Sequence, residues 1–121
     1  MPTTTTAETL DYDREAGEIR YAGAVRVRQA PREMSADNVV VKLDSEQQAQ
    51  RLRAAGGVKI EDRTSGRTVE GADADYDLEA RTAIVTGQPA IIREKSGTVL
   101  RGRRALYDLA TGGAKLLSEQ P

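Results

Sequence analysis

Apolar and charged residues alternate along much of the chain, and this period of two constrains the fold more than any other feature of the sequence. The stretch EIRYAGAVRVR, residues 18–28, places aliphatic, tyrosine and glycine residues on one parity and arginines on the other. The stretch RLRAAGGVKIE, residues 51–61, repeats the arrangement, and TAIVTGQPAIIRE, residues 82–94, follows it less regularly because Pro89 interrupts it. Successive side chains of a strand point to opposite faces, so the pattern predicts half-buried β-strands.

Turn-forming residues extend this prediction to the rest of the chain. The clusters DREAG, DRTSGR, EKSG and LATGG separate the alternating stretches and predict tight turns between strands. Apolar residues follow a helical period only weakly, in SEQQAQRLRAA, and we expect at most one helical turn there, near Ser45–Gln50. The sequence therefore predicts an all-β fold of short strands.

Composition excludes several classes of function. With 121 residues the chain has the size of one domain, and its 18 Lys and Arg balance 19 Asp and Glu, so no overall charge attracts nucleic acid or an anionic membrane. It contains no Cys and no His, which removes thiol nucleophiles, zinc–thiolate sites and the commonest general base. Only 23 residues are Val, Ile or Leu and none is Phe or Trp, so we expect an extended sheet with a narrow core.

Three acidic residues on alternate positions, Asp73, Asp75 and Asp77, suggest a metal-binding or a catalytic site. A calcium loop that begins at Asp73 would need Gly at its sixth position and Glu at its twelfth, where the chain has Leu78 and Ile84. A catalytic carboxylate pair needs environments that separate the two pKa values, and three carboxylates on one solvated face lack them. We therefore interpret them as the outer face of a strand and predict no metal, no cofactor and no catalytic residue.

Two further motifs carry weaker signals. The arginines of LRGRR, Arg101, Arg103 and Arg104, either contact an anionic ligand or protect a sheet edge from pairing. The segments TSGRTVEG and TGG contain glycine but neither a Walker lysine nor a Gly-x-Gly-x-x-Gly pattern, which argues against a phosphate-binding loop. No motif indicates an enzyme.

Internal repetition is the strongest long-range signal. Four dipeptides align at intervals of 28, 36 and 31 residues: Tyr12-Asp13, Val40-Val41, Tyr76-Asp77 and Tyr107-Asp108. Each unit reads as a strand that ends at the dipeptide, a turn, a second strand, a glycine and a short apolar strand. Such a unit cannot bury its own apolar face, so stacked neighbours must supply a continuous core.

The succession of these motifs resembles a known family. MSADNVVVKLD, AQRLRAAGGVKIED and RTVEGADADYDLEARTAIVTGQPAIIREKSGTVLRGRRALYDLATG follow one another as in the OstA-like, LptA-type lipopolysaccharide-transport proteins, the superfamily of LptA, LptC and the N-terminal domain of LptD. The resemblance covers roughly residues 34–111, with a degenerate copy over residues 10–27. It implies an open, twisted β-jellyroll of short antiparallel strands whose apolar interior holds the acyl chains of lipid A. Both ends fall inside a repeat, so we expect a segment truncated from a longer protein.

The resemblance also implies a domain organisation, a location and partners. We expect a flexible segment at residues 1–9, a jellyroll domain at residues 10–117 and a tail at residues 118–121. The implied function is periplasmic binding and transport of lipopolysaccharide between the inner and outer membranes, with no nucleic acid involved. Implied partners are lipopolysaccharide and either other Lpt proteins or further copies of this chain, paired head to tail through terminal strands. The sequence has neither a membrane-spanning apolar stretch nor a signal peptide, so a periplasmic location requires that the signal peptide be absent from this sequence.

Strand parity selects the residues expected to face the lipid. These candidate lipid-binding residues are Ile19, Tyr21, Val25, Val27, Leu52, Val58, Ile60, Ala74, Tyr76, Leu78, Ile84, Ile91 and Tyr107. Two alternatives share the alternation of apolar and charged residues. A structural β-repeat or solenoid would serve as an interaction module without a lipid ligand. A carbohydrate-active jellyroll enzyme would need carboxylates on its concave face, where this parity carries almost none.

Overall fold

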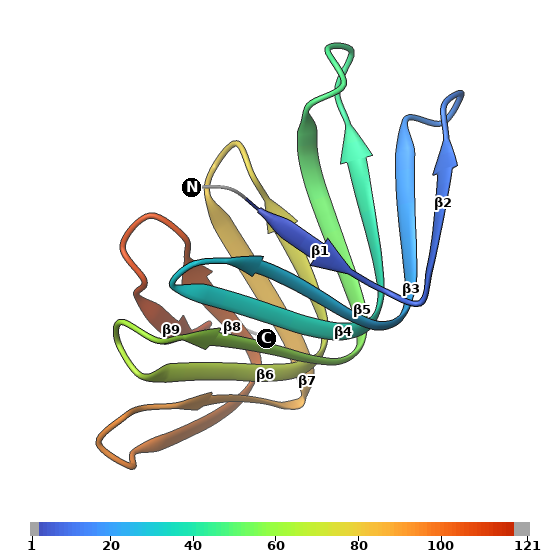
Figure 1. Cartoon of the computed structure of the whole chain (residues 1–121). Helices are drawn as coiled ribbons and strands as arrows, with labels where there is room; N and C mark the ends of the chain where they lie inside the picture. The colour runs from blue at the N-terminus through green and yellow to red at the C-terminus, as the bar shows by residue number, and fades with distance from the viewer. Residues whose placement is uncertain (1–2, 118–121) are drawn as a thin grey trace, which may run out of the picture.

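The chain folds into a single open sheet of antiparallel strands. In a computed structural model, residues 3–117 are described and form nine β-strands and no helix (Figure 1). The strands are β1 (Thr4–Thr6), β2 (Thr9–Asp13), β3 (Glu18–Gln29), β4 (Arg32–Leu43), β5 (Ala49–Asp62), β6 (Arg67–Asp77), β7 (Thr82–Arg93), β8 (Val99–Asp108) and β9 (Ala114–Leu116). The predicted all-β fold is confirmed.

The order of strands in the sheet follows the chain. It runs β1-β3-β4-β5-β6-β7-β8-β9, with β2 also paired to β3 beside β1, and every pairing is antiparallel. Because consecutive strands are neighbours, short turns connect most of them and both ends of the sheet are formed by short terminal strands. Within residues 3–117, no helix has the length and apolarity needed to cross a membrane.

The six long strands bend sharply along a common crease. Pairing registers shift there in each neighbouring pair, for example between Ala55 and Val58 of β5 and between Thr86 and Ala90 of β7. The crease divides the sheet into two arms that face each other (Figure 1). The upper arm contains the turns at residues 14–17, 44–48, 78–81 and 109–113, and the lower arm contains those at residues 30–31, 63–66 and 94–98.

Glycine allows the backbone to make this bend. Gly56 has a φ of 87°, and an added Cβ would lie 2.5 Å from the carboxylate of Asp37, so a larger residue would strain the backbone and displace Asp37. Gly71 meets a different constraint, because an added Cβ would lie 2.8 Å from the carbonyl oxygen of Thr86 on the next strand. Both glycines therefore lie where the strands bend and pairing registers shift.

Aspartates at strand ends set the turns of the upper arm. Asp77 Oδ1 accepts hydrogen bonds from the backbone N–H groups of Glu79 and Ala80 at 3.1 and 3.0 Å. Asp13 and Asp108 end β2 and β8 and accept similar bonds from the turns that follow. The Tyr-Asp dipeptides are thus repeated strand ends, as the sequence pattern indicated.

One expectation about local structure needs correction. Val40-Val41 lies inside β4 and ends no strand; the equivalent strand-ending aspartate is Asp44, whose Oδ1 accepts from Glu46 and Gln48. At Ser45–Gln50, where we expected at most one helical turn, residues 45–47 form a turn and no helix, and β5 begins at Ala49. The four turn-forming clusters all lie at observed turns.

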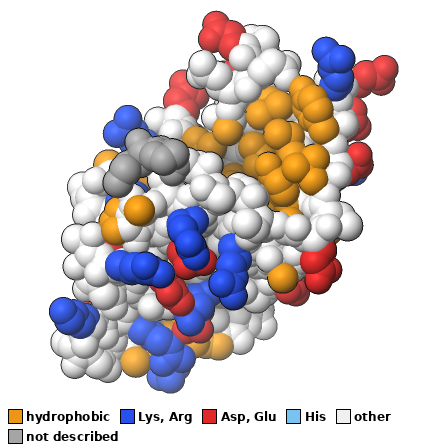
Figure 2. Space-filling view, in the orientation of Figure 1, with side chains coloured by type: hydrophobic (Ala, Val, Ile, Leu, Met, Phe, Trp, Pro, Cys, Tyr) orange, Lys and Arg blue, Asp and Glu red, His pale blue; other side chains and the backbone are white. Residues whose placement is uncertain are grey.

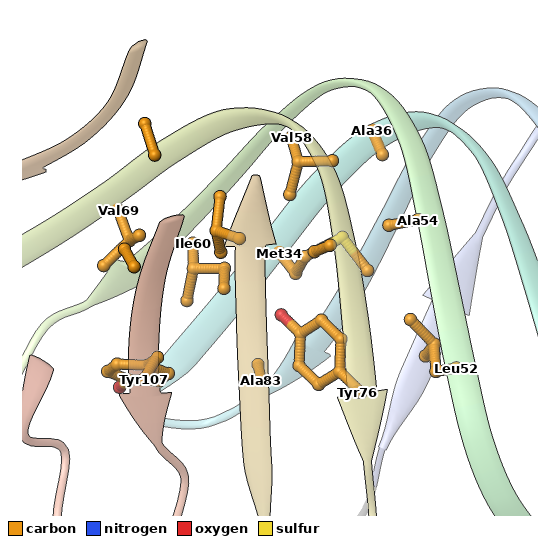
Figure 3. Packing of buried hydrophobic residues seen from close by; sticks show 14 of the residues in the cluster. Met34, Ala36, Leu52, Ala54, Val58, Ile60, Val69, Tyr76, Ala83 and Tyr107 are labelled. Atoms are coloured by element: carbon orange, nitrogen blue, oxygen red, sulfur yellow. The ribbon is translucent and has the colours of Figure 1, made fainter. Parts of the chain in front are cut away.

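The core lies between the two arms and is built from small aliphatic side chains. Val25, Val39, Val85 and Ile92 are fully buried, and alanines fill much of the remaining space. In Figure 3, Ala83 lies in the sheet between the rows of Tyr76 and Tyr107. Register explains this spacing, because Tyr76 pairs with Ala83 and Ala83 pairs with Tyr107, so the small residue leaves room for two rings.

The expected division of the chain at residues 9/10 and 117/118 stays a prediction. Thr4–Thr6, within the segment expected to be flexible, pairs with β3 as β1. The expected tail at residues 118–121 lies outside the described residues.

Candidate binding groove

An apolar groove opens between the two arms at the end of the sheet formed by the first strands. It encloses about 470 Å³. In the space-filling view a large patch of hydrophobic side chains lies over the β2–β3 and β4–β5 hairpins, on the face that this groove exposes (Figure 2). The groove is lined by Thr3, Thr5, Ile19, Tyr21, Val27, Gln29, Arg32, Glu33, Met34, Val41, Leu43, Gln47, Ala49, Leu52, Ile60, Tyr76, Leu78 and Leu109.

Strand register explains why this lining is apolar. On the upper arm Ile19 pairs with Val41 and Val41 with Leu52, and directly paired residues of antiparallel strands share a face. On the lower arm Met34 pairs with Val27 and with Ile60. In Figure 3 Met34 and Tyr76 project into the space between the arms from β4 and β6. Each arm therefore contributes one continuous apolar row.

The first strands leave one end of the groove open. Leu10 and Tyr12 of β2 pair with Tyr21 and Ile19, so they continue the inner face, yet they are 61% and 44% exposed. Opposite them the lower arm ends in β1, which has three residues. The apolar inner face therefore reaches solvent at this end, which we call the open end.

A polar cluster ties the arms together near the last strands. Tyr107 Oη, on the upper arm, donates to Asp62 Oδ2, on the lower arm, at 2.8 Å. The Arg32 guanidinium lies 5.5 Å from the centre of the Tyr107 ring. Arg67 binds both carboxylate oxygens of Glu94, at 2.8 and 3.0 Å, and donates to the carbonyl oxygen of Gly112 in the facing turn. We call Arg32, Asp62, Arg67, Glu94 and Tyr107 the polar clasp.

The clasp changes the titration of its members. Burial works to raise the pKa of Asp62, but hydrogen bonds from Tyr107, Ser65 and Thr64 and the charge of Arg32 outweigh it, so that pKa lies below its usual value. Burial and the bond to Asp62 raise the pKa of Tyr107 to about 12. The clasp therefore holds a charged carboxylate and a neutral phenol at neutral pH.

Most candidate residues face the interior, in two groups. Seven line the groove: Ile19, Tyr21, Val27, Leu52, Ile60, Tyr76 and Leu78. Four others are buried in the core beyond the groove: Val25, Val58, Ala74 and Tyr107. Leu78 reaches the interior from the turn after β6, and its backbone N–H donates to Gln50. That any of them contacts lipid stays a prediction.

Two candidate residues, Ile84 and Ile91, do not face the interior. Ile84 pairs with Asp75 and Leu106 on the outer face, whereas its neighbours Ala83 and Val85 are fully buried. Ile91 pairs with Glu70 and Arg101. Strand β7 carries apolar residues on both faces, so its alternation does not show which face points inward. The inward prediction for these two residues is therefore wrong.

The sequence reasoning missed five of the twelve apolar residues that line the groove. Met34, Val41, Leu43, Ala49 and Leu109 line the groove and were not among the candidates. In β4 the inner residues change parity between Ala36 and Val39, where the crease shifts the pairing register with β5. The signal was present as two short alternations of opposite parity in MSADNVVVKL.

The acidic residues of β6 lie on the outer face, as predicted. Asp73 and Asp75 are exposed, and Arg51 pairs with Asp75 at 3.7 Å and with Asp77 at 3.4 Å. A second hollow of about 490 Å³ lies there, lined mainly by charged residues that include Arg51 and Asp75. This hollow is a solvated ladder of ion pairs, and the apolar groove is the better candidate site.

Comparisons with known proteins agree with this architecture. Residues 4–113 match the family described as LptA/(LptD N-terminal domain) LPS transport protein. Among solved structures, one match is LptH of Pseudomonas aeruginosa, described as the LptA-homologous periplasmic component of the lipopolysaccharide transport device. It superposes with a TM-score of 0.82 at 18% identity and covers 95% of this chain and 81% of LptH, which confirms the open jellyroll fold. A search of curated protein sequences gave no significant match.

Proposed function

Because the chain belongs to the LptA/LptD N-terminal domain family of lipopolysaccharide-transport proteins, we propose that it binds the acyl chains of lipopolysaccharide in its apolar groove. The lipid would lie between the arms with its chains against the two apolar rows, and would move along the inner face toward a partner. Transfer of this kind needs a continuous apolar surface and no chemical step. The proposal therefore includes no catalytic residue.

The observation that carries the proposal is the exposed inner face at the open end. A soluble domain gains stability by covering its apolar residues, yet this sheet leaves Leu10 and Tyr12 in solvent beside the groove. An acyl chain in this position would remove its own surface and that of Leu10 and Tyr12 from water, which stabilises the complex by roughly 0.8 kcal/mol per buried methylene. A structural β-repeat has no such requirement for an open apolar face.

Site-specific photocrosslinking tests the proposal with neighbouring positions on opposite faces. We expect a benzophenone amino acid at Tyr21, which lines the groove, to capture lipopolysaccharide. The same amino acid at Arg20, one residue away on the outer face, is the matched control and should not. Ile84 on the outer face of β7 is a second control. Equal capture from both faces, or no capture from Tyr21, Ile19 and Leu52 with lipid in excess, would favour the structural-repeat alternative.

The ends of the sheet suggest how lipid would leave the domain. Within residues 3–117, β2 at one end pairs only with β3 and is exposed along its length, and at the other end Val99–Gly102 of β8 pairs only with β7. Leu100 continues the inner face there and is 39% exposed. Free strand edges flanked by apolar inner residues favour head-to-tail pairing with an Lpt protein or a second copy.

Light scattering over a range of concentrations tests this assembly. We expect the average mass to rise with concentration, and Leu10→Lys to reduce that rise because it places a charge at the open end. Lys42→Gln, on the outer face, is the control. A strict monomer at millimolar concentration would contradict self-pairing and leave another Lpt protein as the partner.

The location follows from the same proposal. LptH is described as periplasmic, and we propose the same compartment for this chain. Fractionation of cells that express the gene would place the protein with periplasmic markers; recovery with cytoplasmic markers would contradict the proposal.

A further inference from the structure

One cation lies among the described residues that line the apolar groove. Arg32, at the start of β4, is the only Lys or Arg in that lining, and it stands on the inner face of the lower arm near the mouth between the arms. It also belongs to the polar clasp, so it marks the boundary between the open groove and the closed end. A charged group in an apolar lining is costly to bury unless it is paired, so its partners are informative.

The guanidinium of Arg32 is incompletely paired. Its Nε lies 3.7 Å from Asp62 Oδ2, beyond hydrogen-bonding distance, and it is buried without a hydrogen-bond partner. Asp62 has closer partners, since the carboxylate accepts from Tyr107 Oη at 2.8 Å and from two backbone N–H groups at 2.9 and 3.3 Å. The Arg32 side chain remains 25% exposed toward the groove.

The other charge in the lining is neutralised from outside. Glu33 lies beside Arg28 at 3.4 Å and beside Arg26 and Arg63 at 3.9 Å, all three on the outer side of the lower arm. Its carboxylate is therefore surrounded by cations and contributes little repulsion to an anion in the groove. Arg32 is left as the charge that an occupant of the groove would meet.

We propose that Arg32 recognises an oxyanion, a phosphate or a carboxylate, carried by the amphiphile whose acyl chains occupy the groove. The inference rests on the proposed function and adds a specificity-determining contact to it. A planar guanidinium offers several N–H donors in a geometry that fits phosphate and carboxylate oxygens. With the anion at the mouth beside Arg32, the acyl chains extend past Met34 and Ile60 into the groove.

Paired amphiphiles with one tail length test the contact. Binding of dodecyl phosphate, dodecanoate and the neutral 1-dodecanoylglycerol is measured by calorimetry below their micelle concentrations, with inorganic phosphate alone as a fourth ligand. We expect the wild-type protein to prefer the two anions. Arg32→Gln should reduce that preference by about tenfold or more, which corresponds to the loss of one charge-assisted hydrogen bond. The affinity for the neutral amphiphile should not change.

Two control variants separate recognition from net charge and from folding. Lys59→Gln removes one positive charge from the outer face of the same arm, away from the groove lining, and should keep the wild-type preference. Arg32→Lys keeps the positive charge but lacks the planar set of donors, and should retain part of the preference for anionic amphiphiles. Thermal unfolding of each variant checks the fold. If Arg32→Gln does not fold, Arg32→Lys and the wild-type comparison decide the question.

The possible outcomes distinguish this inference from the proposed function. Equal affinity of the wild type for anionic and neutral amphiphiles would overturn the role of Arg32 and leave the groove as a lipid site. Binding of inorganic phosphate as tight as that of dodecyl phosphate would also overturn it, because the site would then serve a free anion. Binding of none of the amphiphiles would contradict the proposed function itself.

Discussion

The two ends of the inner face are built from the same sequence pattern and differ in how they are closed. At the open end Tyr12 pairs with Ile19, and the Tyr12 hydroxyl donates to Gln47 at 2.6 Å in an exposed position. At the other end Tyr107 pairs with Ala83, and its hydroxyl donates to the buried Asp62 on the facing arm. Both tyrosines precede a strand-ending aspartate, so the repeat is the same, and only the second joins the two arms.

This difference suggests that one end of the sheet stabilises the fold and the other end binds the ligand. The end of the sheet that the polar clasp closes, which we call the clasped end, contains most of the fully buried side chains, including Ile92, Val85 and Tyr107. These side chains need no ligand to cover them. At the open end the apolar row of the upper arm continues to Leu10 and Tyr12, opposite the three-residue strand β1, which leaves space for a ligand. The chain has 23 large aliphatic residues, enough for one closed core. We infer that a lipid covers the apolar residues at the open end.

The largest effect should come from removing side-chain volume at the clasped end. Ile92→Ala, at a fully buried position, should lower the free energy of unfolding by about 2–5 kcal/mol because it leaves a cavity. Ile19→Ala, in the groove lining at the open end, should lower it by about 1 kcal/mol or less. Urea denaturation measures both. Similar losses at the two ends would remove the distinction between them.

Deleting one hydroxyl at each end gives a smaller but better matched contrast. Tyr107→Phe leaves Asp62 without its shortest hydrogen bond and should cost about 1.5–3 kcal/mol, the value typical of bonds to charged groups. Tyr12→Phe removes an exposed bond and should change stability by no more than about 0.5 kcal/mol. Comparable denaturation midpoints for the two variants would show that the clasp does not hold the arms together.

A still smaller difference is expected in acid. The pKa of Asp62 is lowered in the folded protein from an ordinary value of 3.8, so its contribution to stability is complete above that value and is lost as pH falls through the folded-state pKa. Asp62→Asn lacks this contribution. The stability advantage of the wild type over Asp62→Asn should therefore shrink as pH falls below about 4. An advantage that is constant from pH 6 to pH 3 would contradict a lowered pKa.

The smallest effect should come from the outer face, which both ends share. Arg51 pairs with Asp75 and Asp77, whose side chains are 49% and 35% exposed, and solvent weakens such pairs. Arg51→Gln should change the free energy of unfolding by less than about 1 kcal/mol and leave lipid capture at Tyr21 unchanged. A loss as large as that of Tyr107→Phe would mean that the outer ion pairs also define the groove.

Local features of the structure could be predicted from the sequence because their causes are local. Alternation identified the long strands, and the clusters around Asp13, Asp62 and Asp108 identified turns, since an aspartate binds backbone groups only a few residues away. Parity also placed most of the inner residues of β3 and β5, where the crease preserves the alternation. The motif order was enough to suggest the family and the open jellyroll.

Only the tertiary structure decided which residues form the groove and which end it opens at. The outward direction of Ile84 and Ile91 depends on pairing with β6 and β8 across the crease, which alternation within one strand does not specify. Asp62 was interpreted only as part of a turn, yet it meets Tyr107 from 45 residues away because folding brings the two arms face to face. Arg32 obtains its place at the boundary in the same way. The side-chain direction in a strand repeats every two residues, so the sequence pattern predicts it. Contact between the arms depends on where the whole sheet bends, which that pattern does not specify.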